Sequence, residues 1–425
     1  MRRIAIFFAV LLLVVALLPA QNAEQYQAES DHYRVVSEVG RSHARQTAER
    51  LEATIELFNE YFHFELSELP SKLRVRIFED KSDFDSYLTR VIDETRDDFI
   101  YLHYGDLRRS ELVGYFHEEP EYEYSLNHEA FIQYLRSFVS EPPLWMREGF
   151  AVYFEEVQYD AATKQAVYRE NLSWLETLKQ IVDGSYGQPA IPLDTMLSID
   201  VETARERIDV FYPQAWGMVS YLLNSEHQNV NRIVWDAMQA LEADASMERN
   251  AERVEQQAVR WVEEQRLLEG FTDYLQDRRS FRELVQEGMD SYEAGENEEA
   301  EKSFVKALTL RDDNHVPYYY LGLLNYDRGN FSLAEYYYRE SLDRGAREAL
   351  AYYALGINAY AGDRFDEATE YLERTIELDP EGYGDEAEHV RTAVESVLED
   401  GPRTADLGGD AGTEEVTTAV LDRLD

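Results

Sequence analysis

The sequence predicts an α+β domain that is followed by an all-α solenoid of helical repeats. Up to about residue 280, short alternating apolar segments, which are typical of strands, are interspersed with amphipathic helical patterns. From Phe281 onward, small residues recur at a constant interval within a continuous helical pattern. The length of 425 residues and the apolar fraction of 44% suffice for two or three domains with sizeable cores.

The elements of the α+β region follow from hydrophobic periodicity and from turn residues. Strands are expected at 32–36, 73–78, 99–104 and 111–116. Helices are expected at 41–62, at 81–92, around residue 128, from about residue 145, at 165–182 and at 212–223. Pro142 and Pro143 should end the helix around residue 128, because proline lacks the amide donor and restrains the residue before it.

The C-terminal region contains an internal repeat of 34 residues. Glycines recur at this interval at Gly288, Gly322 and Gly356, and alanines recur in the same way at Ala300, Ala334 and Ala368. A period of 34 identifies tetratricopeptide repeats, each a pair of helices that pack closely at such small residues. Three units at 281–314, 315–348 and 349–382 and a capping helix are expected, which together give a domain at 281–398 and a flexible acidic tail at 399–425.

The N-terminal residues resemble a secretory signal. Arg2 and Arg3 precede the uncharged run Ile4–Leu18, and small residues suitable for cleavage follow at Ala20 and Ala23. We therefore expect a signal peptide at 1–23, a mature domain at 24–280 and an exported protein, periplasmic or secreted, with an uncleaved membrane anchor as the alternative. The chain has no cysteine, so its stability cannot come from disulfides.

The net charge restricts the class of partner. Asp and Glu number 85 against 41 Lys and Arg, which gives a formal charge of -44. Phosphates would be repelled over most of such a surface, so we expect no nucleic-acid partner.

The chemically most informative stretch is His128-Glu129-Ala130-Phe131-Ile132. It has the pattern of the zinc-protease helix motif H-E-x-x-H, in which two histidines four residues apart bind one metal and the glutamate polarises the bound water. In this chain Ile132 replaces the second histidine.

Five motifs of this chain occur in the order expected for the peptidase-MA-like domain family, and the region that contains them resembles that family. Its members are related to the gluzincin metallopeptidases. They are often found beside such repeats in exported bacterial proteins. The motifs are His32-Tyr33-Arg34-Val35, Leu73-Arg74-Val75-Arg76-Ile77-Phe78, His128-Glu129, Trp145-Met146-Arg147-Glu148-Gly149 and Tyr212-Pro213-Gln214-Ala215-Trp216. The resemblance covers about residues 31–280 and implies a zincin-like fold. It also implies that His128 and Glu148 match zinc ligands, that Glu129 matches the general base, and that Tyr212 is a weaker candidate for a donor to the oxyanion.

The departure at residue 132 places catalysis in doubt, because isoleucine has no lone pair and a catalytic zinc normally has three protein ligands. Gln133 points about 140° away from His128 around a helix, whereas His103 and His117 could supply a third ligand if they fold over the site. Each of these residues also has a purely structural interpretation. His128 could be a core histidine that forms hydrogen bonds, and the carboxylate of Glu148 could stabilise the start of a helix. Ile132 could be an ordinary packing residue of the core.

The repeats offer a second candidate site, the groove that the first helices of such repeats line. Apolar and aromatic residues occupy equivalent groove positions: Met289, Tyr292, Tyr319, Leu323, Tyr326, Tyr353, Ile357 and Tyr360. This stripe suits an extended segment or a helix of a protein partner. The alternative is that some of these rings only fill the space between adjacent helices.

The sequence thus favours an exported adaptor or scaffold. Its peptidase-like domain would be degenerate and non-catalytic, which makes it a pseudoenzyme, and its repeats would bind another protein. No cofactor is expected in that case. The alternative is an active zinc-dependent peptidase with an atypical third ligand, in which Glu129 accepts the proton of the metal-bound water.

Overall fold

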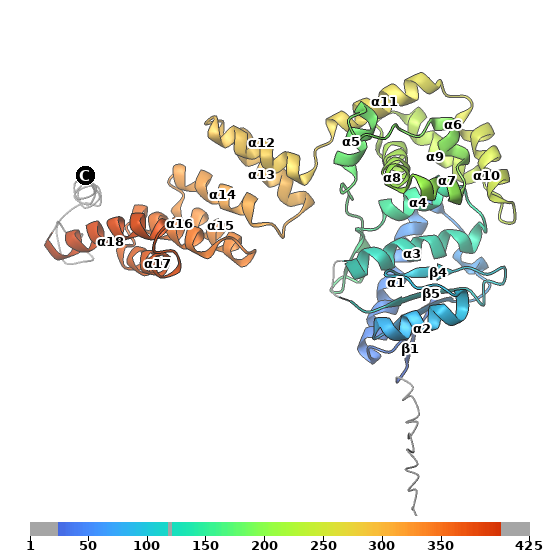
Figure 1. The fold of residues 1–425 in the computed structure, drawn as a ribbon, viewed down its shortest axis with the longest axis horizontal. Coiled ribbons are helices and arrows are strands. Elements are labelled where there is room, and N and C mark those ends of the chain that lie inside the picture. Colours follow the sequence, from blue (N-terminus) through green and yellow to red (C-terminus); the bar gives the residue numbers. More distant parts are fainter. Residues whose placement is uncertain (1–23, 118–120, 401–425) are drawn as a thin grey trace, which may run out of the picture. The chain divides into compact units, whose positions relative to one another are not determined.

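The computed structural model describes residues 24–117 and 121–400 (Figure 1). The predicted signal peptide and the tail beyond residue 400 lie outside the described residues. The chain forms two compact units that alternate along the sequence. Among the described residues, the first unit comprises residues 24–117, 121–143, 150–168 and 240–253, and the second comprises residues 144–149, 169–239 and 254–400.

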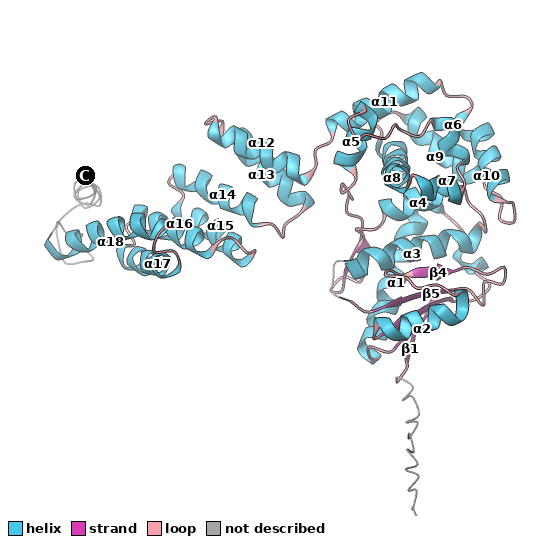
Figure 2. Ribbon diagram, in the orientation of Figure 1, coloured by secondary structure: helices cyan, strands magenta, loops and turns pink. Residues whose placement is uncertain are grey.

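The first unit contains a five-stranded mixed sheet with the strand order β1-β2-β3-β5-β4 (Figure 2). Its strands are β1 (Tyr26–Glu29), β2 (Tyr33–Ser37), β3 (Leu73–Phe78), β4 (Ile100–Leu102) and β5 (Glu111–Tyr115). The strands β2, β3 and β5 are parallel, and the edge strands β1 and β4 are antiparallel to their neighbours. In β3, buried Leu73, Val75 and Ile77 alternate with half-buried arginines, as the sequence predicts for a strand.

Helices cover both sides of this sheet. Figure 1 shows α2 (Lys81–Ile92) and α3 (Glu121–Phe138) on opposite sides of β5, and α1 (Arg41–Phe62) contacts α3. The rings of Phe58, Phe131 and Phe154 meet pairwise at centroid distances of 5.2, 5.0 and 5.3 Å and form the aromatic centre of the core. The unit also contains a 3₁₀ turn at Leu66–Glu68 and most of α10 (Met247–Val254).

The helix predicted at 165–182 was wrong in its N-terminal part and is confirmed from Leu175 onward. Instead of a helix at 165–182, the structure has a hairpin of β6 (Gln158–Asp160) and β7 (Gln165–Val167), followed by the shorter helix α5 (Leu175–Asp183). The Asp160 carboxylate accepts hydrogen bonds from the backbone N–H of Ala162 and the hydroxyl of Thr163, which fixes the turn. Lys164 completes it with a φ of 57°. Such local side-chain bonds compete with helix formation.

The second unit begins with helices grouped around α8 (Ile208–Asn224). The other members are α4 (Leu144–Tyr153, of which the first six residues belong here), α5, α6 (Leu193–Ser198), α7 (Val201–Glu206), α9 (Gln228–Ala240), a π-helical turn (Glu255–Val259) and α11 (Glu264–Asp277). Buried residues of α8, among them Phe211, Ala215, Trp216, Val219 and Leu222, lie on every side of the helix. This distribution identifies α8 as the central helix of the group.

The repeats form an array of helix pairs, as predicted. Its helices are α12 (Phe281–Glu293), α13 (Asn297–Leu310), α14 (His315–Asp327), α15 (Phe331–Asp343), α16 (Glu348–Ala361), α17 (Phe365–Leu378) and the capping helix α18 (Tyr383–Asp400). A Cβ atom at Gly288 would lie 2.7 Å from Phe304, and one at Gly322 would lie 2.5 Å from Tyr338. The periodic glycines therefore let the second helix of each pair place a large side chain against the first.

In the part of the chain that the structure describes, no helix combines the length and the apolar character that crossing a membrane requires.

Candidate functional site

The imidazole of His128 is held by a carboxylate of the same unit. Its Nδ1 lies 2.8 Å from Oε1 of Glu155, and the His128 side chain is 16% exposed. The neighbouring Asn127 is fully buried and donates hydrogen bonds to the backbone carbonyls of Glu155 and Val157, at 2.8 and 2.9 Å. Asn127 thus fixes the segment after α4 against α3 and places Glu155 beside His128.

Glu129 contacts the edge strand of the sheet. Its Oε2 accepts a hydrogen bond of 2.9 Å from the backbone N–H of Tyr101 in β4. An edge strand presents backbone groups that its neighbour strand does not satisfy, and a carboxylate is a strong acceptor for them. In this structure the predicted general base therefore serves to anchor α3 to β4.

The position of the missing histidine lies in the core. Ile132 is 7% exposed, in agreement with its interpretation as a packing residue. The next residue, Gln133, is 1% exposed and donates to the backbone carbonyl of Arg74 in β3 at 2.9 Å. Gln133 is thus directed to the sheet, as its position on the helix predicts.

The two upstream histidines have contacts of their own. Nε2 of His103 lies 3.3 Å from the hydroxyl of Ser140. The ring of His117 packs against Tyr115 and Tyr122, at centroid distances of 5.1 and 5.6 Å. The contacts named here for the two histidines are thus made with a hydroxyl group and with aromatic rings.

The second unit brings Glu148 and Tyr212 together. The Glu148 side chain is 8% exposed, and its Oε1 accepts a hydrogen bond of 2.7 Å from the guanidinium of Arg147. The hydroxyl of Tyr212 in α8 donates to Oε2 of Glu148 at 3.2 Å. Both carboxylate oxygens thus have partners within this unit.

Gly149 explains why α4 and α8 approach closely enough for this contact. A Cβ atom at Gly149 would lie 2.4 Å from the backbone carbonyl oxygen of Ala215 and 2.9 Å from a methyl group of Val219. Only glycine permits that distance between two helices. The Glu-Gly pair of the sequence motif is therefore a packing motif as well as a candidate ligand motif.

Among the described residues, the predicted zinc ligands do not gather into a three-ligand cluster. Within residues 24–117 and 121–400, no three histidine, aspartate or glutamate side chains lie close enough together to hold a metal ion. Glu155 lies at Nδ1 of His128, and Arg147 lies at Oε1 of Glu148. A carboxylate at one ring nitrogen is also the usual partner of a histidine that binds a metal through the other nitrogen, so the contact of His128 does not argue against a metal.

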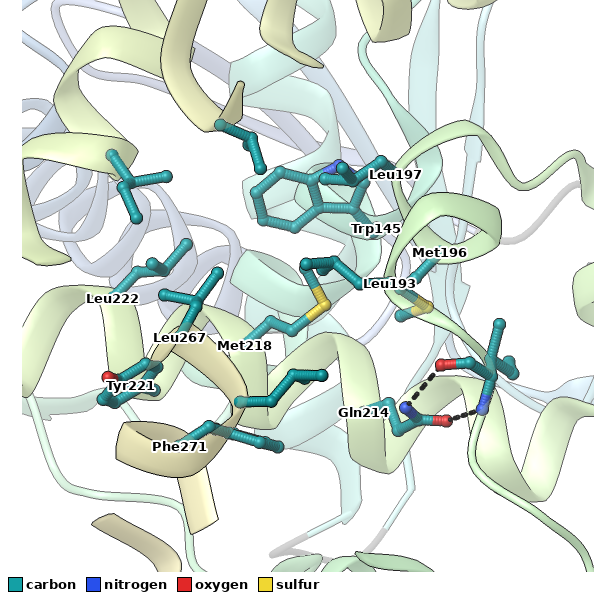
Figure 3. Close-up of a pocket in the computed structure, with 14 residues that line it drawn as sticks. Trp145, Leu193, Met196, Leu197, Gln214, Met218, Tyr221, Leu222, Leu267 and Phe271 are labelled. Atoms are coloured by element: carbon teal, nitrogen blue, oxygen red, sulfur yellow. Dashed lines mark hydrogen bonds between the residues drawn. The ribbon is translucent and has the colours of Figure 1, made fainter. Parts of the chain in front are cut away.

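An apolar cavity of about 60 Å³ lies in the second unit, enclosed by side chains from α4, α6, α8, α9 and α11 (Figure 3). The indole of Trp145 forms one wall, and its Nε1 is buried without a hydrogen-bond partner among the described residues. Gln214 is bonded through both side-chain atoms to the backbone of Ile191, at 2.7 and 3.2 Å. The part of its lining that the structure describes contains no carboxylate, amine or imidazole, and its titratable side chain is the phenol of Tyr221. The sequence analysis did not predict this cavity. The feature of the sequence that pointed to it was the apolar character of α8.

The predicted groove residues of the repeats lie on the first helices α12, α14 and α16 and are all half-buried: Met289, Tyr292, Tyr319, Leu323, Tyr326, Tyr353, Ile357 and Tyr360. Tyr319, Leu323 and Tyr326 pack against the core cluster of Ala334, Tyr338, Ala354 and Leu355. Tyr319 and Tyr326 thus fill space between helices with part of their surface, as the alternative interpretation holds, and all eight residues keep part of their surface exposed. Binding by these residues stays a prediction.

One member of this stripe escaped the sequence pattern. Tyr383, in the first turn of α18, stacks on Tyr353 with a centroid distance of 5.6 Å and an interplanar angle of 30°. Counting 34 residues from Tyr353 leads to Ala387, which is fully buried, so the repeat period cannot find Tyr383. The stripe of Tyr292, Tyr319, Tyr353 and Tyr383, which we call the tyrosine stripe, runs over four helices.

Comparisons with known proteins place parts of the chain among relatives. Residues 125–241 match a family that is described as a protein of unknown function (DUF1570). This segment runs from α3 to α9 and includes His128, Glu129, Glu148 and Tyr212.

Among curated proteins, a 53-residue segment is 51% identical to isocitrate/homoisocitrate dehydrogenase from each of two strains of Thermus thermophilus. It covers 12% of this chain and 16% of the dehydrogenase. The chain therefore spans about a sixth of the curated proteins that it matches, and nothing of their activity is carried over.

Two solved structures of the repeat type are similar to part of the chain. The first repeat domain of Spaghetti (RPAP3), bound to an HSP90 peptide, has 21% identity and a TM-score of 0.27 and covers 29% of this chain and 97% of that one. The MamA RS-1 ArsTM double mutant has 18% identity and a TM-score of 0.28 and covers 40% of this chain and 91% of that one.

Proposed function

We propose that this protein is an exported adaptor whose repeat array binds a segment of a partner protein. The observation that carries the proposal is the half-buried aromatic and apolar stripe that continues over α12, α14, α16 and α18. Aromatic side chains that keep one face outward in a helical array provide large contact areas for a peptide at a small entropic cost. Three repeats with a cap are sufficient for an independently stable array.

We further propose that the peptidase-like region acts without zinc catalysis. Two contacts support this part of the proposal: the Tyr101 backbone on Glu129, and Arg147 on Glu148. Each gives a predicted catalytic group a structural partner. The competing function, a zinc-dependent peptidase, requires Glu129 as general base, whereas an adaptor does not.

Export remains part of the proposal on the basis of the first residues alone. The pair Arg2 and Arg3 ahead of the apolar run is typical of a secretory signal, and the absence of cysteine is compatible with any redox compartment. Mass spectrometry of the protein purified from its own cells, after separation of the envelope and culture medium from the cytoplasm, tests this. A start at residue 21 or 24 is expected, and an intact N-terminus in the cytoplasm would contradict export.

Affinity capture with the full-length protein tests the adaptor function. Four baits are compared: the unmodified chain, Glu129→Gln, the groove variant Tyr319→Ala with Tyr353→Ala, and a control variant, Tyr336→Ala. Tyr336 lies on α15, the second helix of its pair, and is 52% exposed. We expect the same partner on every bait except the groove variant, whose melting temperature is measured to confirm that it is folded. A partner retained by the groove variant would overturn the proposal. A protein captured only by Glu129→Gln would favour the peptidase, because removing the general base stops turnover and leaves the substrate bound.

A further inference from the structure

We infer that the groove of the repeat array selects a cationic, extended segment whose arginine or lysine side chains, separated along the segment, lie against the tyrosine stripe. The inference rests on the proposed function, because it names the chemistry of the segment that the same groove binds.

The rings of the tyrosine stripe form one connected surface. Tyr353 stacks on Tyr383, and Tyr292 meets Tyr320 on the next first helix at a centroid distance of 5.6 Å. Burial raises the pKa of Tyr319 to about 12, and its phenol neighbours Tyr383, Tyr320, Tyr292 and Tyr353 contribute to that rise, which places these hydroxyls in one electrostatic neighbourhood. The phenols are therefore neutral near pH 7 and offer uncharged π faces.

Carboxylates accompany these rings. Oδ2 of Asp327 accepts a hydrogen bond of 3.1 Å from the hydroxyl of Tyr292. Burial is the main reason that the pKa of Tyr353 is raised, and Glu386 is the largest charged contributor to that rise. Asp363 contributes to the raised pKa of Tyr360 in the same way, after burial. A ring face next to a carboxylate attracts a guanidinium or an ammonium through both the ring quadrupole and the opposite charge.

The array itself shows that its tyrosines receive cations. The guanidinium of Arg347 lies 4.8 Å from the ring centroid of Tyr383, and that of Arg344 lies 4.1 Å from the ring of Tyr318. Among the described residues, no arginine or lysine lies over the rings of Tyr292, Tyr319 or Tyr353. These three positions are therefore where a partner's cations fit.

The rings that could receive these cations lie on three different helices: Tyr292 on α12, Tyr319 on α14 and Tyr353 on α16. Cations that are separated along an extended segment can therefore reach more of these rings at once than adjacent cations can. The pattern Arg-X-X-Arg-X-X-Arg serves as the probe of this arrangement.

This pattern separates recognition from general attraction to an acidic protein. Four labelled peptides of equal length serve as probes of the full-length chain in fluorescence anisotropy at about 0.15 M salt. The first has three arginines separated by two neutral residues each, the second has the same composition with the arginines adjacent, and the third and fourth replace the spaced arginines by glutamine or glutamate. We expect the spaced arginine peptide to bind about tenfold more tightly than the adjacent one, since it engages more rings at once.

A pair of matched variants locates the binding. Tyr319→Leu with Tyr353→Leu keeps apolar volume but removes the π faces, and it should lower the affinity of the spaced peptide to that of the adjacent one. Tyr336→Leu on α15 should leave both affinities unchanged. Thermal melting of each variant confirms that the array is folded.

Three results would overturn the inference. Equal affinity of the spaced and adjacent peptides would indicate general charge attraction, and tighter binding of the glutamate peptide would indicate the opposite charge preference. If the glutamine peptide binds as tightly as the spaced arginine peptide and the double variant abolishes both, the groove binds peptides without charge selection. In that last case the proposed function survives and only the inference fails.

Discussion

The hydroxyl of Tyr212 donates a hydrogen bond to the carboxylate of Glu148 across the contact between α8 and α4, at 3.2 Å. Arg147 donates to the other carboxylate oxygen, so the buried Glu148 is satisfied on both sides. Burying a carboxylate is tolerated only with such partners. Two residues to which the sequence assigned separate catalytic roles are thus partners in one structural contact.

This contact depends on Gly149, and we expect Gly149→Ala to lower the free energy of unfolding by about 1–3 kcal/mol. The added Cβ would lie 2.4 Å from the Ala215 carbonyl oxygen, which belongs to the backbone and cannot turn away. Urea denaturation followed by tryptophan fluorescence measures the change. Gly105→Ala is the matched control, because a Cβ there meets no atom within 4 Å. Equal stability of the two variants would show that α4 and α8 separate without cost.

Strongly periodic elements were predictable to the residue. The bounds expected for the helices at 41–62 and 81–92 and for the strand at 73–78 coincide with those of α1, α2 and β3. In these segments apolar residues follow one period without interruption, so local pattern and final burial agree. The hairpin at 158–167 was missed because the side chain of Asp160 fixes its turn, and this contact has no hydrophobic period.

The sequence identified residues of the candidate site, but it did not predict which residues they contact. The sequence identified His128, Glu148 and Tyr212, yet Glu155, which binds His128, lies 27 positions further along the chain. Asn127 places it there through two backbone carbonyls, and no spacing rule describes such a bond. The same holds for Tyr383, whose place on the tyrosine stripe follows from the packing of α18 and not from the repeat.

The zinc hypothesis can be tested with Ile132→His, which restores the second histidine of the motif on α3. We expect the unmodified full-length protein to retain far less than one zinc per chain after equimolar zinc and a mild chelator, because no described cluster offers three ligands. Zinc per chain is measured by atomic emission. Near-stoichiometric zinc in the unmodified chain would mean that a third ligand exists and would revive the peptidase.

The same experiment classifies the scaffold. Ile132→Leu is the control for disturbance of the core, because it changes the shape of the side chain without adding a donor. If Ile132→His takes up zinc and the other two proteins do not, the geometry of the remaining ligands has been kept although one ligand was lost. Absence of zinc from all three proteins would agree with the contacts of His128 and Glu148 to other side chains.

Glu111 of β5 binds two arginines of the neighbouring strand β3 and should contribute strongly to the free energy of unfolding. Its side chain is 4% exposed and accepts hydrogen bonds from Arg74 at 2.9 Å, from Arg76 at 3.2 Å and from Tyr87 at 2.9 Å. We expect Glu111→Gln to lower the free energy of unfolding by about 3 kcal/mol, because two guanidinium groups then lose their counter-charge. The exposed Glu29, which pairs with Arg34 and Lys72, provides the control. If Glu29→Gln destabilised as much as Glu111→Gln, burial would not be the cause.

His43 should make the stability of the first unit depend on pH below neutrality. Its ring lies between the hydroxyls of Ser37 and Tyr122, at 3.0 and 3.2 Å, and against the ring of Phe116, and burial lowers its pKa below the ordinary value near 6.5. The unfolded chain therefore binds this proton more readily than the folded one. The stabilising contribution is complete above about pH 6.5 and is lost as the pH falls through 6.5 toward the lower pKa of the folded state.

The melting temperature at pH 7 and at pH 5.5 measures this effect in the unmodified chain and in His43→Gln. Carboxylates that titrate in the same range contribute equally to both proteins, so the difference between the two slopes isolates His43. We expect the unmodified chain to lose more thermal stability on acidification than the variant does. Parallel slopes would mean that His43 keeps its ordinary pKa in the folded protein, and the two hydroxyls would then have to accommodate the charged imidazolium.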